Sequence, residues 1–314
     1  MVSQKGVKVY NVAAVQARME YIGGQALIEG VMILSKERVG IALAKGTHIK
    51  IVEQPRPRFS KRFEKVWFVR GIVALAEMLY IGTKALLLSA EEAAVEEEGK
   101  DKKNSEKVER QPQSFGMWEI LIGIALPIVV AIALFIAAPF FLASLMVENG
   151  VLFNVIEGII RVIIFVAYLV VIAQFKDIQR VFQYHGAEHM AVHCHEAGKK
   201  LSVAAVRDYA KEHPRCGTSF LILVLLIAIV VFSFVTTESK ILQVLARIIL
   251  IPAIAGISYE ILKIGAKFQQ HLWMRPLILP GIWVQRITTA TPDDQQIRVA
   301  IAAVNACVRA EKKL

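Results

Sequence analysis

The chain has 314 residues, of which 55% are hydrophobic and 20% are charged, and its formal net charge at pH 7 is +10. A mean hydropathy of +0.51 together with long uncharged runs excludes an ordinary soluble domain and predicts an integral membrane protein. The three cysteines, Cys194, Cys216 and Cys307, form no even set, so they indicate a reducing compartment or metal and redox use more than disulfides.

The N-terminal region, residues 1–66, is predicted to form a small β-rich cytoplasmic cap followed by a basic linker. Residues 1–20 are polar, and the next 35 residues alternate as in about three short strands. Gly23, Gly24 and Gly30 indicate a backbone that needs positive φ or close approach. Glu29, beside them, is either a solvated strand residue or a carboxylate directed at the histidine cluster described below.

Residues 67–89 predict an amphipathic helix, because Arg70, Glu77 and Lys84 recur at seven-residue spacing among apolar residues. We expect this helix to lie in the membrane interface or against the helical bundle rather than to span the bilayer. Residues 90–116 are rich in charge and low in complexity, which is typical of a solvated helix end that continues into a linker.

The fold class is that of a mainly α membrane protein with four transmembrane helices in two hairpins. The predicted spans are residues 117–147, 151–175, 218–237 and 241–264. A histidine-rich cytoplasmic segment, residues 176–217, separates the hairpins, and a cytoplasmic tail with a helix, residues 265–314, follows the last span.

The distribution of Lys and Arg predicts the orientation. Of 37 such residues, 19 lie in residues 1–116, seven in residues 176–218 and eight after residue 260. The positive-inside rule then places both termini and the histidine-rich segment in the cytoplasm, with the chain in the cytoplasmic membrane. This topology explains the net positive charge, so nucleic-acid binding is not required, and the sequence indicates no particular protein partner.

Three charged residues fall within the predicted spans away from the histidine-rich segment and the span ends: Glu157, Arg161 and Arg247. Glu157 precedes Arg161 by one helical turn, and Arg247 lies in the fourth span. Such groups normally pair, so we expect a buried ion-pair cluster that holds the spans together; a polar pathway or a lipid headgroup site is the alternative.

The tail is predicted to begin with an extended stretch containing proline and aromatic residues. A helix then starts near Thr291, because Pro292, Asp293 and Asp294 suit a helical first turn. Its apolar stripe predicts that this helix docks on another element, with Cys307 as a small buried residue.

The histidine-rich segment predicts a metal site. Between His185 and Cys216 lie five of the seven histidines. On a helix over residues 177–197, His185 and His189 share one face and Glu188 flanks them. This is the HxxEH spacing of inverted zinc peptidases, in which two histidines bind Zn²⁺ and the glutamate acts as a general base on water.

The third metal ligand stays open at this point. The nearby candidates are Glu196, His193, His213 and Cys216, with Glu260 and Glu29 as more distant ones, whereas His195 points away from the His185 face. Arg215 is a candidate for holding an anionic group. A purely structural metal and an inert, interfacial set of histidines are the plainer interpretations.

Five motifs carry a resemblance to a known family. They are GGQALIEGVM, RVFQYHGAEHMAVHCHE, HPRCGTSF, GISYEILK and PGIWVQRITTATPDD. In this order they resemble the YqhQ family of bacterial membrane proteins, also described as domain of unknown function 1385 and as a predicted metal-dependent enzyme. The resemblance implies membrane location, a metal site and a set of functional residues. That set is Glu29, His185, Glu188, His189, His213, Arg215, Cys216 and Glu260.

Three functions follow as hypotheses. The first is a metal-dependent hydrolase facing the cytoplasm and acting on a lipid or another membrane-bound substrate, with zinc as the expected divalent metal and iron as the alternative. The second is a diiron lipid hydroxylase or desaturase, which also places histidines on the inner side of four spans. The third is a non-enzymatic, metal-stabilised membrane scaffold that binds partners.

Overall fold

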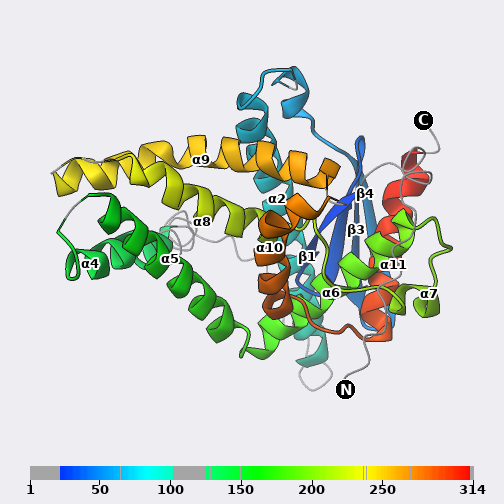
Figure 1. Cartoon of the computed structure of the whole chain (residues 1–314). Coiled ribbons are helices and arrows are strands. Elements are labelled where there is room, and N and C mark those ends of the chain that lie inside the picture. The colour runs from blue at the N-terminus through cyan, green and yellow to red at the C-terminus, as the bar shows by residue number, and fades with distance from the viewer. Residues whose placement is uncertain are drawn as a thin grey trace, which may run out of the picture.

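A computed structural model describes residues 22–63, 65–101, 125–126, 129–148, 150–235, 237, 239–268 and 271–311. The polar residues 1–20, most of the charged linker and the start of the first predicted span lie outside these ranges. Figure 1 shows two parts, a helical bundle that projects to one side and a sheet covered by helices. The bundle is formed by α4 (Ala138–Ser144), α5 (Val151–Ile172), α8 (Gly217–Ser233) and α9 (Lys240–Phe268), and α10 (Arg275–Thr288) lies between the two parts.

The N-terminal cap is an antiparallel sheet of four strands in the order β1-β2-β3-β4. These strands are β1 (Gly23–Leu27), β2 (Gly30–Leu34), β3 (Arg38–Lys45) and β4 (His48–Pro55). The predicted small β-rich region is therefore confirmed, with four strands in place of about three. The stretch from Gly23 to Leu34 reverses direction at Glu29, which has a φ of 52° and so occupies the left-handed region that turns require.

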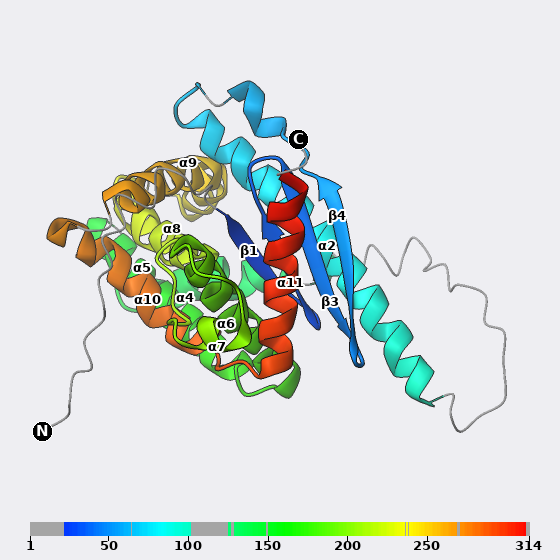
Figure 2. The same ribbon diagram turned by 90° about the vertical axis from the view of Figure 1, so that its right-hand side faces the viewer.

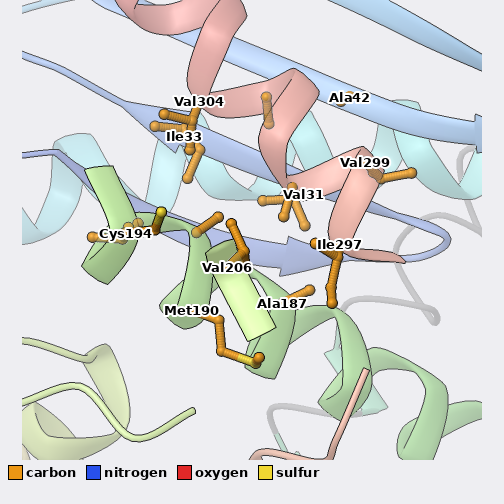
Figure 3. Packing of buried hydrophobic residues seen from close by; sticks show 14 of the residues in the cluster. Val31, Ile33, Ala42, Ala187, Met190, Cys194, Val206, Ile297, Val299 and Val304 are labelled. Carbon is orange, nitrogen blue, oxygen red and sulfur yellow. The ribbon is translucent and has the colours of Figure 1, made fainter. Parts of the chain in front are cut away.

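Helices cover both faces of the sheet. On one face, residues of β2 and β3 pack against α6 (Lys176–Glu196), α7 (Val203–Arg207) and α11 (Asp294–Glu311). Figure 3 shows this core, in which Val31, Ile33 and Ala42 of the sheet meet side chains of all three helices. On the other face, Met32 and Ile41 pack against α2 (Val69–Asp101), and Figure 2 shows α11 and α2 on opposite sides of the sheet. All five residues of β2 are buried, because it is an inner strand covered on both faces.

Helix α2 is longer than the predicted helix over residues 67–89. It continues to Asp101 through the start of the predicted charged linker, because that stretch is built of Ala and Glu, which favour helix. Its Glu92 also pairs with Lys45 and Lys50 of β3 and β4. Packing against the sheet thus extends along much of α2.

Three helices are long and apolar enough to cross a membrane in the described part of the chain. They comprise Val69–Val95 within α2, Val151–Ile172 (α5) and Ile241–Gly265 within α9 (Lys240–Phe268). The apolar stretch Val129–Ser144 includes the π-helical turn η3 (Ala133–Ala137) and α4 (Ala138–Ser144), and α8 (Gly217–Ser233) is also shorter. The chain is therefore a mainly helical protein with membrane-spanning candidates and a small antiparallel sheet.

The start of the C-terminal tail differs from the prediction. Residues expected to be extended form the short 3₁₀ helix η4 (Leu272–Met274) and then α10 (Arg275–Thr288), with Pro276 in its first turn and Pro280 inside it. Proline suits the first turn of a helix, so it did not exclude one here. Gly281 of α10 lies against Ser219 of α8, and this close contact brings α10 onto the bundle.

Two further predictions for the tail are confirmed in outline, namely a helix that starts near Thr291 and an apolar stripe on that helix that packs with Cys307 buried. Helix α11 begins at Asp294 with a reciprocal cap, since Asp293 Oδ1 accepts from the Gln296 N–H at 2.8 Å and Gln296 Oε1 accepts from the Asp293 N–H at 2.9 Å. Ile297, Val304 and Cys307 are fully buried against the sheet and α6.

Candidate metal centre

Helix α6 carries the two histidines of the HxxEH motif on one face. The helix runs from Lys176 to Glu196 and ends before Gly198, whose φ of 68° terminates it. The rings of His185 and His189 lie one turn apart with centroids 4.3 Å from each other. At Gly186 a Cβ atom would come 2.2 Å from the Ala290 carbonyl oxygen, so glycine lets the chain after α10 lie directly on α6.

Backbone carbonyls fix the orientation of both rings. His185 Nδ1 lies 2.8 Å from the Thr288 carbonyl oxygen, and His189 Nδ1 lies 2.5 Å from that of Lys211. A carbonyl can only accept, so each Nδ1 carries the proton and each Nε2 presents a lone pair. This is the arrangement by which proteins orient metal-ligating histidines.

Cys216 is the third member of this group. Its sulfur lies 3.2 Å from His185 Nε2, and the potential ligand atoms of His185, His189 and Cys216 all lie within 4.8 Å of one another. Cys216 is also the N-cap of α8 and accepts from the Thr218 N–H at 3.4 Å. The amino end of a helix favours negative charge, such as a metal-bound thiolate carries.

Glu188 lies beside the His189 ring of this group. It is 4% exposed, and its Oε2 is 3.6 Å from His189 Nε2. Burial raises the pKa of Glu188 to about 7, although the nearby His185 acts in the opposite direction. The two imidazole nitrogens and the thiol, with this buried carboxyl group beside one of the rings, are donors that a divalent cation would stabilise.

His193, Glu196 and His213 form a second, adjoining group with ligand atoms within 4.8 Å of one another. The rings of His189 and His213 have centroids 5.7 Å apart. His213 Nδ1 accepts from the Arg215 N–H at 3.2 Å, so its proton is on Nε2, which faces Glu196 Oε2 at 3.5 Å. Both ring nitrogens of His213 thus already have hydrogen-bond partners within the chain.

Arg215 pairs with Glu196 in this second group. Burial acts to raise the pKa of Glu196, but His213 and Arg215 outweigh it and hold this pKa below its usual value. Burial lowers the pKa of His213 to about 4, so this imidazole is neutral at pH 7. The second group is therefore a hydrogen-bonded network that is satisfied without a metal, and it flanks the first group.

Gln285 of α10 positions the loop that carries His213 and Cys216. It is fully buried, its Nε2 donates to the His213 carbonyl and to Ser219 Oγ, both at 2.8 Å, and its Oε1 accepts from the His213 N–H at 2.7 Å. Sequence reasoning missed Gln285, because a lone glutamine within an apolar stretch gives no sign of what it contacts. The available signal was that Gln285 lies within the PGIWVQRITTATPDD motif.

Two of the distant ligand candidates lie outside the cluster. Glu29 at the β1-β2 turn pairs with Arg180, and its Oε2 accepts from the Tyr184 hydroxyl at 3.2 Å. Glu260 of α9 accepts two hydrogen bonds from Arg70 of α2, at 2.7 and 2.5 Å. In this structure neither carboxylate reaches the histidines, because each pairs with an arginine from another element, Arg180 of α6 and Arg70 of α2. His195 belongs to neither histidine group.

Glu157, Arg161 and Arg247 meet at the opposite end of the bundle. Glu157 of α5 pairs with Arg161 on the same helix and with Arg247 of α9, whose Nη2 lies 2.9 Å from Glu157 Oε2. Arg247 Nη2 also donates to Asn154 Oδ1 at 2.7 Å. All three charged side chains are buried, so this cluster links two helices by charge-assisted hydrogen bonds.

The comparisons with known proteins identify the family. Residues 66–310 match the family model described as "Protein of unknown function (DUF1385)". The chain is also 32% identical to "Uncharacterized protein YqhQ" of Bacillus subtilis (strain 168) over 298 residues, which is 92% of each chain. The chain belongs to the DUF1385 family. No solved structure matches it.

Membership of DUF1385 confirms the resemblance drawn from the motifs. The matched region starts just before α2 and includes α6, the loop with Cys216, and α10, so the whole candidate centre lies inside the DUF1385 match. The sheet of residues 23–55 precedes that match, yet it packs directly on α6.

Proposed function

We propose that this DUF1385 protein binds one zinc ion through His185, His189 and Cys216. The observation that carries the proposal is the pair of backbone acceptors, the carbonyls of Thr288 and Lys211, which turn both Nε2 atoms toward one point beside the Cys216 sulfur. Two imidazoles and a thiolate favour Zn²⁺ over the carboxylate-rich ligand sets of diiron enzymes.

The activity that this ligand set supports best is hydrolysis. With three protein ligands, Zn²⁺ keeps a position open for water or substrate, and it makes water acidic and polarises a carbonyl or phosphoryl group. Glu188 lies next to His189 and has its pKa raised to about 7 by burial, which suits a group that accepts and returns a proton near neutral pH.

The proposed substrate is bound to a membrane. The histidine groups follow α5 directly along the chain and precede α8, two apolar helices of the bundle. Lys and Arg are concentrated in the segments outside the apolar helices, which by the positive-inside rule orients this end of the bundle toward the cytoplasm. A lipid or a lipid-linked molecule is therefore the proposed class of substrate.

Metal analysis of the purified protein tests the proposal. About one zinc per chain is expected in the wild type, and the double variant His185→Ala with His189→Ala is expected to lose it. His195→Ala is the matched control, since it removes a histidine of the same helix that lies in neither group. Stoichiometric zinc in the double variant, or zinc loss in the control alone, would contradict the assignment.

A structural zinc in a membrane scaffold is the second candidate. It is favoured by the positions of the ligands. His185 and His189 lie on α6 and Cys216 lies at the start of α8, so a metal bound to all three would cross-link the two helices. Glu188→Gln separates the candidates. A hydrolase should keep zinc and the folded state but lose turnover of membrane lipid extracts, measured as product release by mass spectrometry in nanodiscs. In a scaffold, the same substitution should leave the complementation of a deletion strain intact.

A further inference from the structure

A second polar site lies where α2 begins beside the end of α9 (Figure 1), away from the histidines. It is a cavity of about 370 Å³ that is lined chiefly by cationic side chains. The lining residues are Lys36, Arg56, Arg58, Arg70, Ala74, Tyr259 and Lys263. They come from the β2-β3 turn, the segment after β4, α2 and α9.

Two of the arginines are held rigidly with their carboxylates behind them. Arg56 Nε and Nη2 donate to Glu77 Oε1 at 2.9 and 2.8 Å, and Arg56 Nη1 donates to the Ser35 carbonyl at 2.9 Å. The Glu77 side chain is 0% exposed, whereas that of Arg56 is 22% exposed. Arg70 covers Glu260 in the same way, with exposed fractions of 25% and 5%. The cavity wall therefore presents guanidinium groups rather than carboxylates.

The cavity carries excess positive charge. Arg56, Arg58 and Arg70 pair with Glu77, Glu37 and Glu260. Lys36 and Lys263 are exposed, and neither has a carboxylate at ion-pair distance in the part of the chain that the structure describes. Two ammonium groups beside preorganised guanidinium groups form a site for an oxyanion, and a phosphate group can accept from several of them at once.

The position of the cavity indicates where such a phosphate comes from. Tyr259 and Lys263 lie in the last turns of the apolar stretch Ile241–Gly265, so the cavity is at the end of a membrane-spanning candidate. Trp67, which precedes α2 by two residues, is 67% exposed, and Phe59 is 54% exposed. Aromatic residues and basic residues gather at the headgroup level of bilayers.

We propose that this cavity binds the phosphate-bearing headgroup of an anionic membrane lipid. The five cationic side chains hold the phosphate, and the exposed aromatic residues lie at the membrane surface where the acyl chains enter the bilayer. This site is independent of the proposed zinc centre, because it shares no residue with it. Its role is to recognise an anionic lipid at the inner end of α9.

Binding of short-chain phosphatidylglycerol to the purified full-length chain in detergent tests the proposal. Lys36→Gln with Lys263→Gln removes the two cations that have no ion pair among the described residues and leaves the three ion pairs in place. We expect its affinity to fall by roughly tenfold or more relative to the wild type, measured by thermophoresis. The matched control is Lys61→Gln with Lys65→Gln, which removes the same charge from exposed positions outside the cavity and should bind as the wild type does.

The competing outcomes are distinct. Equal affinity in the wild type and the cavity variant, or equal losses in the cavity and control variants, would overturn the proposal in favour of unspecific attraction to basic surface. Inorganic phosphate should compete with the lipid at millimolar concentration. Binding of inorganic phosphate without binding of the lipid would overturn the lipid as the source of the phosphate group. An unchanged melting temperature of each variant shows that the fold is retained.

Discussion

Gly24 of β1 lies directly against the carboxyl group of Glu188 on α6, and a Cβ atom at Gly24 would come 2.6 Å from Glu188 Oε1. The sheet therefore forms one wall of the candidate metal centre, although its residues supply no ligand. Because the backbone of β1 excludes water from this side, Glu188 is buried next to His189. The cap thus has a part in the chemistry proposed for α6.

Gly24→Ala is the first test of this contact. The new methyl group must displace either Glu188 or β1, so we expect a loss of about 1–3 kcal/mol in the free energy of unfolding and weaker zinc binding. Gly23→Ala is the matched control, since a Cβ atom there meets nothing within 4 Å. Thermal unfolding and zinc titration of both variants give the comparison, and equal behaviour of the two would refute the role of Gly24.

Gln285→Leu should disturb the centre without touching a ligand. The substitution leaves the His213 N–H and carbonyl and the Ser219 hydroxyl without their buried partner, at a cost of about 2–4 kcal/mol in stability. Zinc affinity should fall together with stability in this variant, because the loop with Cys216 loses its attachment to α10. Gln295→Leu, at an exposed position of α11, removes only a surface hydrogen bond to the Gly46 carbonyl, so in the same zinc titration and unfolding assay it should leave zinc affinity unchanged and cost about 1 kcal/mol or less in stability.

Glu157→Gln tests the ion-pair cluster of the bundle. It leaves Arg161 and Arg247 buried without a counter-charge, so we expect a loss of about 3–5 kcal/mol in the free energy of unfolding in detergent. Zinc content should stay unchanged if the protein is purified folded, because the cluster and the centre share no residue. Glu148→Gln, at an exposed position before α5, serves as the control and should unfold as the wild type does.

The contribution of Glu188 to the stability of the zinc-free protein should fall as the pH rises from about 4.5 to 7. Burial raises the pKa of Glu188 from its ordinary value of 4.5 to about 7, so the folded state retains a proton that the unfolded state loses in this window. The expected loss is on the order of 3 kcal/mol. His213, with its pKa lowered to about 4, acts in the opposite sense as the pH falls below 6.5.

The difference between the wild type and Glu188→Gln isolates this effect, because the contribution of His213 is common to both. Denaturant unfolding at several pH values, with zinc removed by a chelator, measures it. A wild type and a variant that show the same pH dependence would contradict the buried, proton-binding state of Glu188.

The sequence predicted the local features and missed the long-range ones. Spacing along a helix was enough to predict that His185 and His189 share a face and that α6 ends before Gly198, since both follow from the helical period and from glycine at a C-terminus. The choice of Cys216 over His193, Glu196 and His213 depended on a loop whose path is set by Gln285. Periodicity does not determine that path.

The two misplaced carboxylates illustrate the same limit. Glu29 and Glu260 belong to two of the motifs that carry the family resemblance, yet each pairs with an arginine that is distant in sequence, Arg180 and Arg70. A carboxylate without an assigned partner could equally have reached the histidines. Only the packing of α2 on α9 and of the sheet on α6 decides between these partners.

X-ray absorption spectroscopy at the zinc edge tests the central claim most directly. The purified wild-type protein should contain about one zinc per chain, with one sulfur at about 2.3 Å and two imidazole nitrogens at about 2.0–2.1 Å. Cys216→Ser should lose the sulfur shell and keep the imidazole shell. A protein without stoichiometric metal, or a zinc whose shell contains no sulfur, would contradict the proposed centre of His185, His189 and Cys216.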